Sequence, residues 1–429
     1  MSKNENKALV PKLRFPEFEG IGAVQLKYGN VIFEAISNKN HNSDLPVLAI
    51  TQEYGAIPRD RIDYNISVTD KSIENYKIVE IGDFIISLRS FQGGIEYSSF
   101  QGVCSPAYII LRKKIDLVEY YYKYYFKTDK FIRDLNKNLE GIRDGKMVSY
   151  SQFSVILLPN PRKVEQQKIA DCLSSLDDLI AAEDKKLKTL KEHKKGLMQK
   201  LFPAEGETVP EWRFPEFKDS GEWKEKKLEE AVETITDYVA AGSFADLKSK
   251  VNYKASPDFA QLVRTVDIKN NFRNKDFVYV NREAFKFLWR VDLNLDAIIM
   301  PNIGANIGEV YYLKSSVLPY KNNVLGPNAL LLRCNKNDNT FIFNLLLSDM
   351  FQKLLKLIVA ASGQPKFNKT ELKLITICIP TLIEQQKIAG CLSALDDLIT
   401  AQTEKIEVLK QHKKALMQGL FPSAQEVFE

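Results

Sequence analysis

The sequence predicts an α+β protein in which two mixed, β-rich domains are joined by two long helices that form an intramolecular antiparallel coiled coil, with a pseudo-two-fold internal repeat. The first observation is a 39-residue segment at 165–203 that recurs at 384–422 without a gap, with 27 of 39 positions identical. The second is a shorter motif, RFPEF, at 14–18 and again at 213–217. The third is a heptad pattern of apolar residues in both copies of the long segment. The chain therefore contains two copies of the same flanking segments, and each copy encloses an insert of different sequence.

The repeats divide the chain into four segments. We place a first variable domain at 1–160 and a first conserved helix at 161–203. A second variable domain then occupies 204–380, and a second conserved helix with a C-terminal tail occupies 381–429. Each repeated helix is expected to end at the proline of its terminal Leu-Phe-Pro, because proline cannot continue a helix.

Apolar residues recur at alternating spacings of four and three in both conserved helices, which is the seam of a coiled coil. The seam residues are Ile169, Leu173, Leu176, Ile180, Leu187, Leu190 and Leu197 in the first helix, and Ile388, Leu392, Leu395, Ile399, Ile406, Leu409 and Leu416 in the second. An apolar seam of this length needs a covering partner. We expect the two helices of this chain to cover each other, and the alternative is a helix of another protein.

The charges along the helices favour antiparallel pairing. Residues 165–184 carry six acidic side chains and one lysine, whereas residues 185–201 carry seven lysines and one glutamate. The second copy repeats this trend more weakly. Antiparallel pairing would place acidic halves beside basic halves, although the same polarity also suits the dipole of each helix.

The two variable domains differ in residues but show the same order of predicted elements. Each has a strand, a glycine-containing turn and a strand, then an apolar run, a helical stretch, a glycine-containing loop and a last strand-like run. These are expected at 82–99, 105–113, 117–135 and 153–161 in the first domain, and at 295–313, 328–334, 340–358 and 373–380 in the second.

Composition leaves the function open but limits it. The chain has 429 residues, of which 45% are hydrophobic and 27% are charged, and it contains no long apolar run of the kind that spans a membrane. Five scattered cysteines without a CxxC pair suit a reducing cytoplasm, which is where we expect the protein. The net charge of +5 permits a polyanionic partner, with basic clusters at 112–146 and 264–290.

Most enzyme classes lack their motifs here. The sequence has no P-loop, no GxGxxG between a strand and a helix, and no Pro-Pro of the kind found in amino-methyltransferase motifs. Its three histidines offer neither a catalytic triad nor a zinc site, so no metal is expected. One loose PD…DxK pattern, at Asp258, Asp267 and Lys269, raises the hypothesis of a magnesium-dependent nuclease, which we regard as a remote alternative.

The repeats resemble those of the specificity (S) subunit of type I restriction–modification systems. The resemblance is carried by the RFPEF motifs, the Glu-Gln-Gln at 165–167 and 384–386, the KIA…LxxLDDLI segments and the HKKxLMQxLFP endings. It implies that each variable domain is a target-recognition domain that reads one half of a bipartite, asymmetric DNA sequence. The resemblance also implies that the coiled coil sets the spacing between the halves and that the subunit is not itself an enzyme.

The same resemblance implies the partners. They are double-stranded DNA, two methyltransferase (modification) subunits that bind S-adenosylmethionine and methylate adenine, and two restriction/translocase subunits that use ATP and magnesium. The resemblance thus implies a role in antiviral defence, with no cofactor in this chain. The competing hypothesis is an adaptor that does not bind DNA, with two β-rich binding domains on a coiled-coil strut.

Residues that contact DNA should lie in glycine-containing turns, where the backbone can approach a groove, and should carry forked or basic side chains. The candidates are Arg89, Ser90, Gln92, Arg143 and Lys146 in the first domain, and Asn302, Asn306, Lys366 and Asn368 in the second. The alternative for each of them is ordinary turn or surface chemistry.

Overall fold

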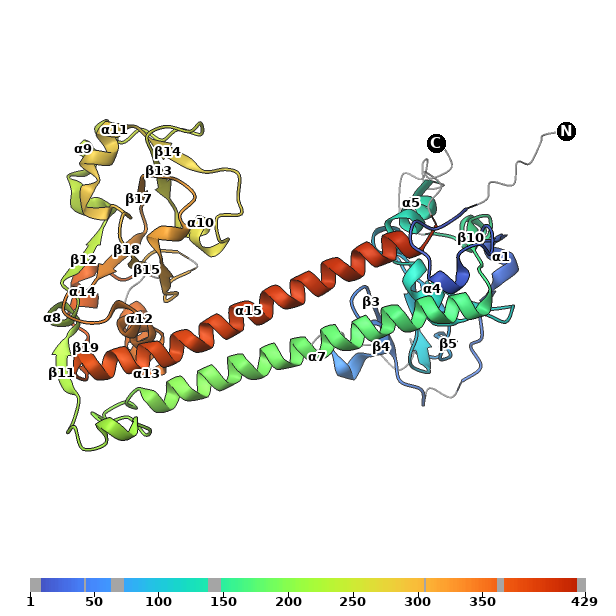
Figure 1. The fold of residues 1–429 in the computed structure, drawn as a ribbon, viewed down its shortest axis with the longest axis horizontal. Coiled ribbons are helices and arrows are strands. Elements are labelled where there is room, and N and C mark those ends of the chain that lie inside the picture. Colours follow the sequence, from blue (N-terminus) through green and yellow to red (C-terminus); the bar gives the residue numbers. More distant parts are fainter. Residues whose placement is uncertain are drawn as a thin grey trace. The chain divides into compact units, whose positions relative to one another are not determined.

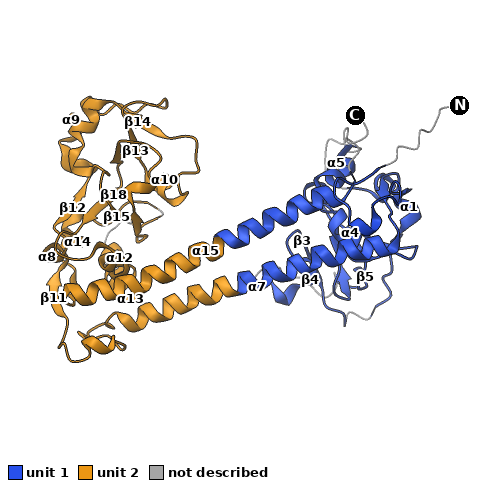
Figure 2. Cartoon of the chain, in the orientation of Figure 1, with its two compact units in different colours: residues 1–185, 404–429 blue, residues 186–403 orange. Residues whose placement is uncertain are grey.

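The computed structural model describes residues 9–41, 44–62, 73–137, 148–304, 306–360 and 366–422. The chain forms two compact units, coloured in Figure 2: the first unit has residues 1–185 and 404–429, and the second unit has residues 186–403. Two long helices, α7 (Lys163–Leu201) and α15 (Leu382–Leu420), have 39 residues each (Figure 1). Each helix contributes one part to each unit, so every unit contains a piece of both repeats.

A four-stranded antiparallel sheet forms the centre of each unit. In the first unit its order is β2 (Phe33–Ile36), β9 (Ile109–Lys113), β6 (Phe84–Ile86) and β7 (Glu96–Tyr97). In the second unit it is β12 (Thr234–Asp237), β18 (Ala329–Arg333), β15 (Ala297–Pro301) and β16 (Tyr311–Leu313). Strands that hold the same place in the two sheets also follow one another in the same order along the chain. The α+β class, the internal repeat and the shared order of elements are confirmed.

Smaller sheets accompany the central one in each unit. The first unit has the pairs β3 (Leu48–Thr51) with β4 (Gly55–Pro58) and β5 (Lys77–Val79) with β8 (Gly102–Cys104). The second unit has one three-stranded sheet, β14 (Val278–Val280), β13 (Ala260–Val263) and β17 (Asn323–Leu325), in which β13 and β17 are parallel. A further antiparallel pair in each unit joins the strand after the RFPEF motif to the strand just before the next long helix. These pairs are β1 (Leu26–Tyr28) with β10 (Leu157–Pro159), and β11 (Lys224–Lys227) with β19 (Thr376–Ile379).

The central sheets are buried on both faces, because successive side chains of a strand point to opposite sides. In the first unit Phe84 and Ile86 pack among helical residues, whereas Ile85 packs with the smaller strands. Ile298 and Ile299 divide between two cores of the second unit in the same way. This explains why these strands are apolar runs without alternation.

The helical stretches predicted at 117–135 and at 340–358 are helical, and each is divided into two helices. They are α4 (Glu119–Tyr125) and α5 (Asp129–Lys137) in the first unit, and α12 (Asn339–Leu347) and α13 (Asp349–Ala360) in the second. A buried hydroxyl stands at each break, from Thr128 and Ser348. Each hydroxyl donates to the carbonyl three residues earlier, at 2.8 and 2.6 Å, and accepts from the amide three residues later, at 3.3 and 3.4 Å. The hydroxyl thus competes with the backbone bonds that would continue the helix.

The two long helices run antiparallel within each unit, as their charges predicted. In the second unit Lys194 of α7 donates to the carboxylate of Asp396 of α15 at 2.6 Å. In the first unit Lys413 of α15 donates to Asp177 of α7, which is the same pair at the repeat-equivalent positions. Among the residues that the structure describes, no helix has the length and apolar character needed to cross a membrane.

The seam of the coiled coil merges with the core of each unit. Its outermost residues are almost fully buried, with Leu173 and Leu392 at 0% exposure, whereas the seam residues further along the helices are half-buried except for the buried Ile406. Leu420 and Phe421, at the end of the second repeat, lie in the core of the first unit. Leu201 and Phe202, at the end of the first repeat, lie in the core of the second unit. Each core is therefore completed by both repeats.

Reversing the charge of Lys194 (Lys194→Glu) is expected to destabilise the second unit by about 1 kcal/mol, since it places two acidic groups together at a half-buried pair. Adding Asp396→Lys should recover part of that loss. The coupling is measured by a double-mutant cycle in chemical denaturation. Lys188→Glu, in the exposed pair with Glu192, is the control and should change stability by less than about 0.5 kcal/mol. Zero coupling between Lys194 and Asp396 would show that this pair does not stabilise the antiparallel helices.

A buried arginine–glutamate pair explains the RFPEF and Glu-Gln-Gln motifs. Arg14 donates through Nε and Nη2 to both carboxylate oxygens of Glu165 at 2.7 and 2.8 Å. Arg213 donates in the same way to Glu384 at 2.6 and 2.7 Å. These hydrogen bonds raise the pKa of both arginines. The forked geometry ties each RFPEF motif to the first turn of a long helix.

The first glutamine of each Glu-Gln-Gln ties that helix to the helix pair of its own unit. The amide oxygen of Gln166 accepts from the backbone N–H of Val118 at 2.9 Å, just before α4. The amide oxygen of Gln385 accepts from the N–H of Asp338 at 3.0 Å, just before α12. Both glutamines are almost fully buried. The repeated motifs are therefore structural, and they hold the same elements in the same places in both units.

Candidate nucleic-acid interface

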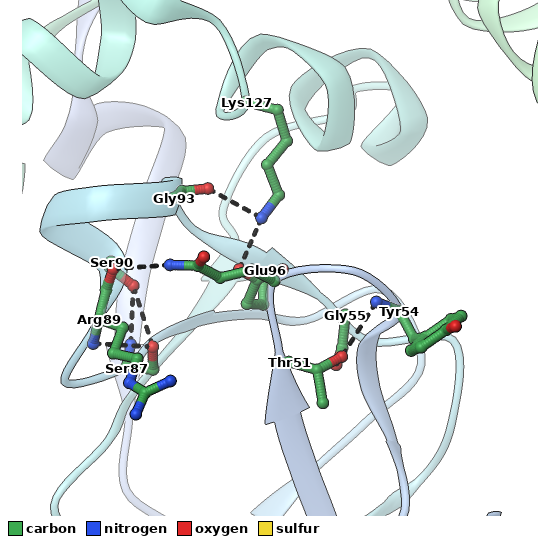
Figure 3. A network of polar contacts seen from close by, with 10 residues as sticks. Thr51, Tyr54, Gly55, Ser87, Arg89, Ser90, Gly93, Glu96 and Lys127 are labelled. Atoms are coloured by element: carbon green, nitrogen blue, oxygen red, sulfur yellow. Dashed lines mark hydrogen bonds and ion pairs between the residues drawn. The ribbon is translucent and has the colours of Figure 1, made fainter. Parts of the chain in front are cut away.

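The turn between β6 and β7 carries the first group of candidates. It forms a short helix, α3 (Ser90–Gly93), and Figure 3 shows it from close by. The side chains of Arg89 and Gln92 are exposed. Ser90 is only 1% exposed, and its Oγ accepts from the N–H of Ser87 at 2.9 Å. The hydroxyl of Ser90 therefore shapes the turn from inside, and Arg89 and Gln92 are the side chains that remain available to a ligand.

Contacts of Lys127 and the close packing of Gly94 hold this turn in place. Lys127 donates to the carbonyl of Gly93 at 3.0 Å and to the carboxylate of the buried Glu96 at 2.6 Å (Figure 3). Burial raises the pKa of Glu96, and the charge of Lys127 opposes that effect. Gly94 has a φ of 80°, and a Cβ there would lie 2.0 Å from the carbonyl oxygen of Phe126. Only glycine fits this position, so the turn has little freedom to move.

In the first unit the β3–β4 hairpin touches the same turn, a contact that the sequence did not predict. The side-chain amide of Gln52 donates to the carbonyl of Arg89 at 3.3 Å. Thr51 accepts from the N–H of Tyr54 and donates to the carbonyl of Gly55, which fixes the hairpin tip (Figure 3). Tyr54 is 63% exposed. Two segments distant in the sequence thus share one polar surface.

Of the second unit's candidates, Asn302 and Lys366 lie next to each other. Ile303 and Lys366 form an isolated antiparallel bridge, and Asn302 donates through its side chain to the carbonyl of Phe367 at 3.2 Å. Lys366 is exposed. Asn368 caps the helix α14 (Lys369–Lys373), accepting from the N–H of Glu371 at 2.9 Å. Asn368 therefore has a structural task, whichever ligand the surface binds.

Asn306 belongs to the turn that follows β15, and it accepts from the ammonium group of Lys269 at 2.9 Å. The same ammonium group pairs with Glu309 at 2.7 Å. Burial raises the pKa of Glu309, but the bonds from Lys269 and Tyr311 outweigh it and lower that pKa. Lys269 ends the short helix α10 (Thr265–Lys269), which follows the strand β13 of the smaller sheet, so here too a segment next to a smaller sheet contacts the turn of the central sheet. Arg143 and Lys146 lie outside the described residues.

The loose nuclease pattern does not form a cluster. Asp258 pairs with Lys254 at 2.5 Å, and Asp267, at 0% exposure, pairs with Arg264 at 2.7 Å. Lys269 is engaged with Glu309. Throughout the described parts of the chain, no three His, Cys, Asp or Glu side chains gather where they could hold a metal ion. The three residues have separate partners, so their geometry gives the nuclease hypothesis no support.

The comparisons with known proteins agree with this architecture. The family model of the type I restriction modification DNA specificity domain matches the chain twice, at residues 20–192 and 220–411. The type I restriction enzyme MjaVIII specificity subunit of Methanocaldococcus jannaschii is 27% identical over 371 residues, which cover 82% of this chain and 80% of that protein.

Two solved structures share the fold. A chain from a structural study of complex assembly and conformational transition in the type I R-M system aligns with a TM-score of 0.55 and 14% identity, covering 92% of this chain and 97% of that chain. The S subunit of a type I restriction–modification system from M. genitalium aligns with a TM-score of 0.53 and 14% identity, covering 97% and 100%. With two family matches over most of its length, this chain belongs to the type I restriction–modification DNA specificity family.

Proposed function

We propose that each unit reads one half of a bipartite, asymmetric DNA target and that the coiled coil sets the gap between the halves. The main observation in support of this proposal is that one repeated frame presents two different surfaces. Arg14–Glu165 and Arg213–Glu384 hold equivalent elements in both units. The turns on those elements differ in every candidate side chain. Equal frames with unequal surfaces suit an asymmetric target, whereas identical surfaces would suit a palindrome.

The chemistry of the candidate surfaces suits DNA. Arg89 and Gln92 are exposed on the turn of the first unit, and Lys366 is exposed beside Asn302 in the second. Arginine, asparagine and glutamine can read base edges through paired hydrogen bonds, and lysine binds phosphate. Two segments meet at each turn, which allows side chains of both to reach neighbouring bases.

The remaining expectations follow from the family. The chain would be a non-catalytic subunit that works in the cytoplasm and directs two methyltransferase subunits and two restriction/translocase subunits to DNA. S-adenosylmethionine, ATP and magnesium would then be bound by those partners and not by this chain.

The test is co-expression of the chain with the modification subunit of its system, followed by mapping of methylated adenines by single-molecule sequencing. The expected result is one motif with two unequal halves and a fixed gap. Binding of the complex to that motif should weaken steeply with salt, because phosphate contacts release counterions. A complex that forms, methylates no motif and binds with little salt dependence would instead support the adaptor hypothesis.

A further inference from the structure

The loop at residues 269–275 of the second unit is rich in asparagine and basic residues. Its sequence is Lys-Asn-Asn-Phe-Arg-Asn-Lys, with three asparagines, three basic residues and no acidic one. We propose that this loop, called the reading loop below, enters a DNA groove and reads bases of the half-site that belongs to the second unit. The inference rests on the proposed function and deepens it, since it names residues outside the turn candidates.

The side chains that could contact DNA point to solvent. Asn270, Asn271, Arg273 and Lys275 are all exposed. Within the described parts of the chain, the side chains of Arg273 and Lys275 form no hydrogen bond or ion pair, although the backbone N–H of Arg273 donates to the carbonyl of Asn270 at 3.1 Å. Asparagine pairs with the major-groove edge of adenine and arginine with that of guanine, each through two hydrogen bonds. The loop thus carries base-reading groups flanked by basic groups for phosphate.

Arg264 holds both ends of the reading loop. Its guanidinium donates to Asp267 Oδ1 at 2.7 Å, before the loop, and to the carbonyl of Asp276 at 2.9 Å, after it. Asp267 is 0% exposed. The two acidic residues next to the loop are therefore bound to Arg264, and the exposed charge of the loop remains positive.

The backbone of the loop is held in an uncommon conformation. Asn271 and Phe272 have φ angles of 48° and 55°, in the left-handed region that residues other than glycine rarely adopt. The N–H of Phe272 donates to the carbonyl of Asp267 at 2.8 Å, and its partly buried ring packs against the core of the unit. Such conformations persist only where the surroundings enforce them, and they are concentrated at binding sites. A loop fixed in advance loses little entropy when it binds.

The reading loop contacts the turn after β15, which carries the candidate Asn306. Its first residue, Lys269, donates to Asn306 and pairs with Glu309, so the two segments lie side by side. Gln52 makes the corresponding contact with Arg89 in the first unit. In both units a segment that adjoins a strand of a smaller sheet therefore extends the surface of the turn. This repetition with different side chains is what a pair of reading surfaces with different targets requires.

The experiment maps methylation by the full complex carrying Arg273→Lys or Asn271→Gly. Arg273→Lys keeps the charge but loses the fork, and Asn271→Gly removes the amide while glycine keeps the positive φ. Each variant should relax or lose one base in one half of the motif, with a drop in methylation rate at the original site of roughly 5- to 150-fold. The other half should stay unchanged in the same molecules, which makes it an internal control.

Arg290→Lys is the matched control, because Arg290 is an exposed arginine of the same unit in a different element, η5 (Trp289–Val291). It should leave both halves intact. If the wild type gives a bipartite motif and both loop variants leave it unchanged, the reading loop does not read bases, although the proposed function stands. An equal loss at all sequences would make the loop a phosphate contact and would also overturn the inference. Absence of any motif with the wild type would count against the proposed function itself.

Discussion

Replacing Arg213 by alanine is expected to destabilise the second unit by about 3–5 kcal/mol, because it leaves the carboxylate of Glu384 buried without its charge partner. The side chains of Arg213 and Glu384 are 8% and 0% exposed. The arginine also donates to the carbonyl of Gly221 at 2.6 Å, so a second acceptor loses this donor. An exposed ion pair would lose far less, since water would solvate the remaining charge.

The measurement is urea denaturation followed by tryptophan fluorescence. All three tryptophans, at 212, 223 and 289, belong to the second unit, so the signal reports on that unit. Trp223 also donates to Glu384 at 3.3 Å, which places one probe at the mutated pair. Glu211→Ala is the control, because its pair with Lys200 is exposed, and it should cost at most about 1 kcal/mol. Equal transitions for Arg213→Ala and Glu211→Ala would show that the buried pair is not needed for stability.

The long helices could be predicted from the sequence because their apolar spacing is local and repeated. The seam from Ile169 to Leu197 follows the helical period within a single segment, and its charges report the antiparallel direction. The role of the RFPEF motif could not be predicted in this way. Arg14 and Glu165 are 151 positions apart, and no periodicity connects a short extended motif with a helix start that far along the chain. The repeated sequence identified these residues as important without giving their partner.

The breaks in the predicted helices were hidden for a related reason. Thr128 and Ser348 are acceptable residues in a helix, and only the bonds of their hydroxyls show that they end one and begin another. Candidate DNA contacts were predicted from turn chemistry, which selected the exposed Arg89 and Gln92 and also the buried Ser90. Burial depends on packing with segments elsewhere in the chain. The reading loop lies inside the basic cluster predicted at 264–290, but charge alone does not distinguish it from the rest of that cluster, since the bonds by which Arg264 holds its ends depend on the fold.

The division of labour between the repeats and the inserts also follows from the contacts. Repeated residues such as Glu165 and Gln166 bind backbone and side chains inside the frame, and they are almost fully buried. The residues that differ between the units, such as Arg89 and Asn302, lie on turns at the ends of equivalent strands. A change in the inserts can therefore alter the surface while the frame stays intact. Such an arrangement allows the two surfaces to diverge independently.

Replacing Phe421 by alanine should destabilise the first unit by about 3–5 kcal/mol, although this residue lies near the far end of the chain. Phe421 is 4% exposed, and its ring lies 5.1 Å from that of Tyr121 and 5.6 Å from that of Tyr125. The substitution would open a cavity among large aromatic side chains that cannot easily close it. Phe202 holds the equivalent position in the second unit, next to Trp223 and Phe341.

This pair of positions allows a test in which each variant is the other's control. Phe421→Ala should shift the unfolding transition seen by circular dichroism and leave the tryptophan transition near its wild-type midpoint, because no tryptophan lies in the first unit. Phe202→Ala should shift the tryptophan transition. Val408→Ala, at a 63% exposed position of α15, should change stability by less than about 0.5 kcal/mol. If Phe421→Ala behaved like Val408→Ala, the end of the second repeat would not be part of the first unit's core. If the expected loss is seen, the first unit depends for part of its stability on the end of the second repeat, and the repeat contributes to folding as well as to the proposed spacing.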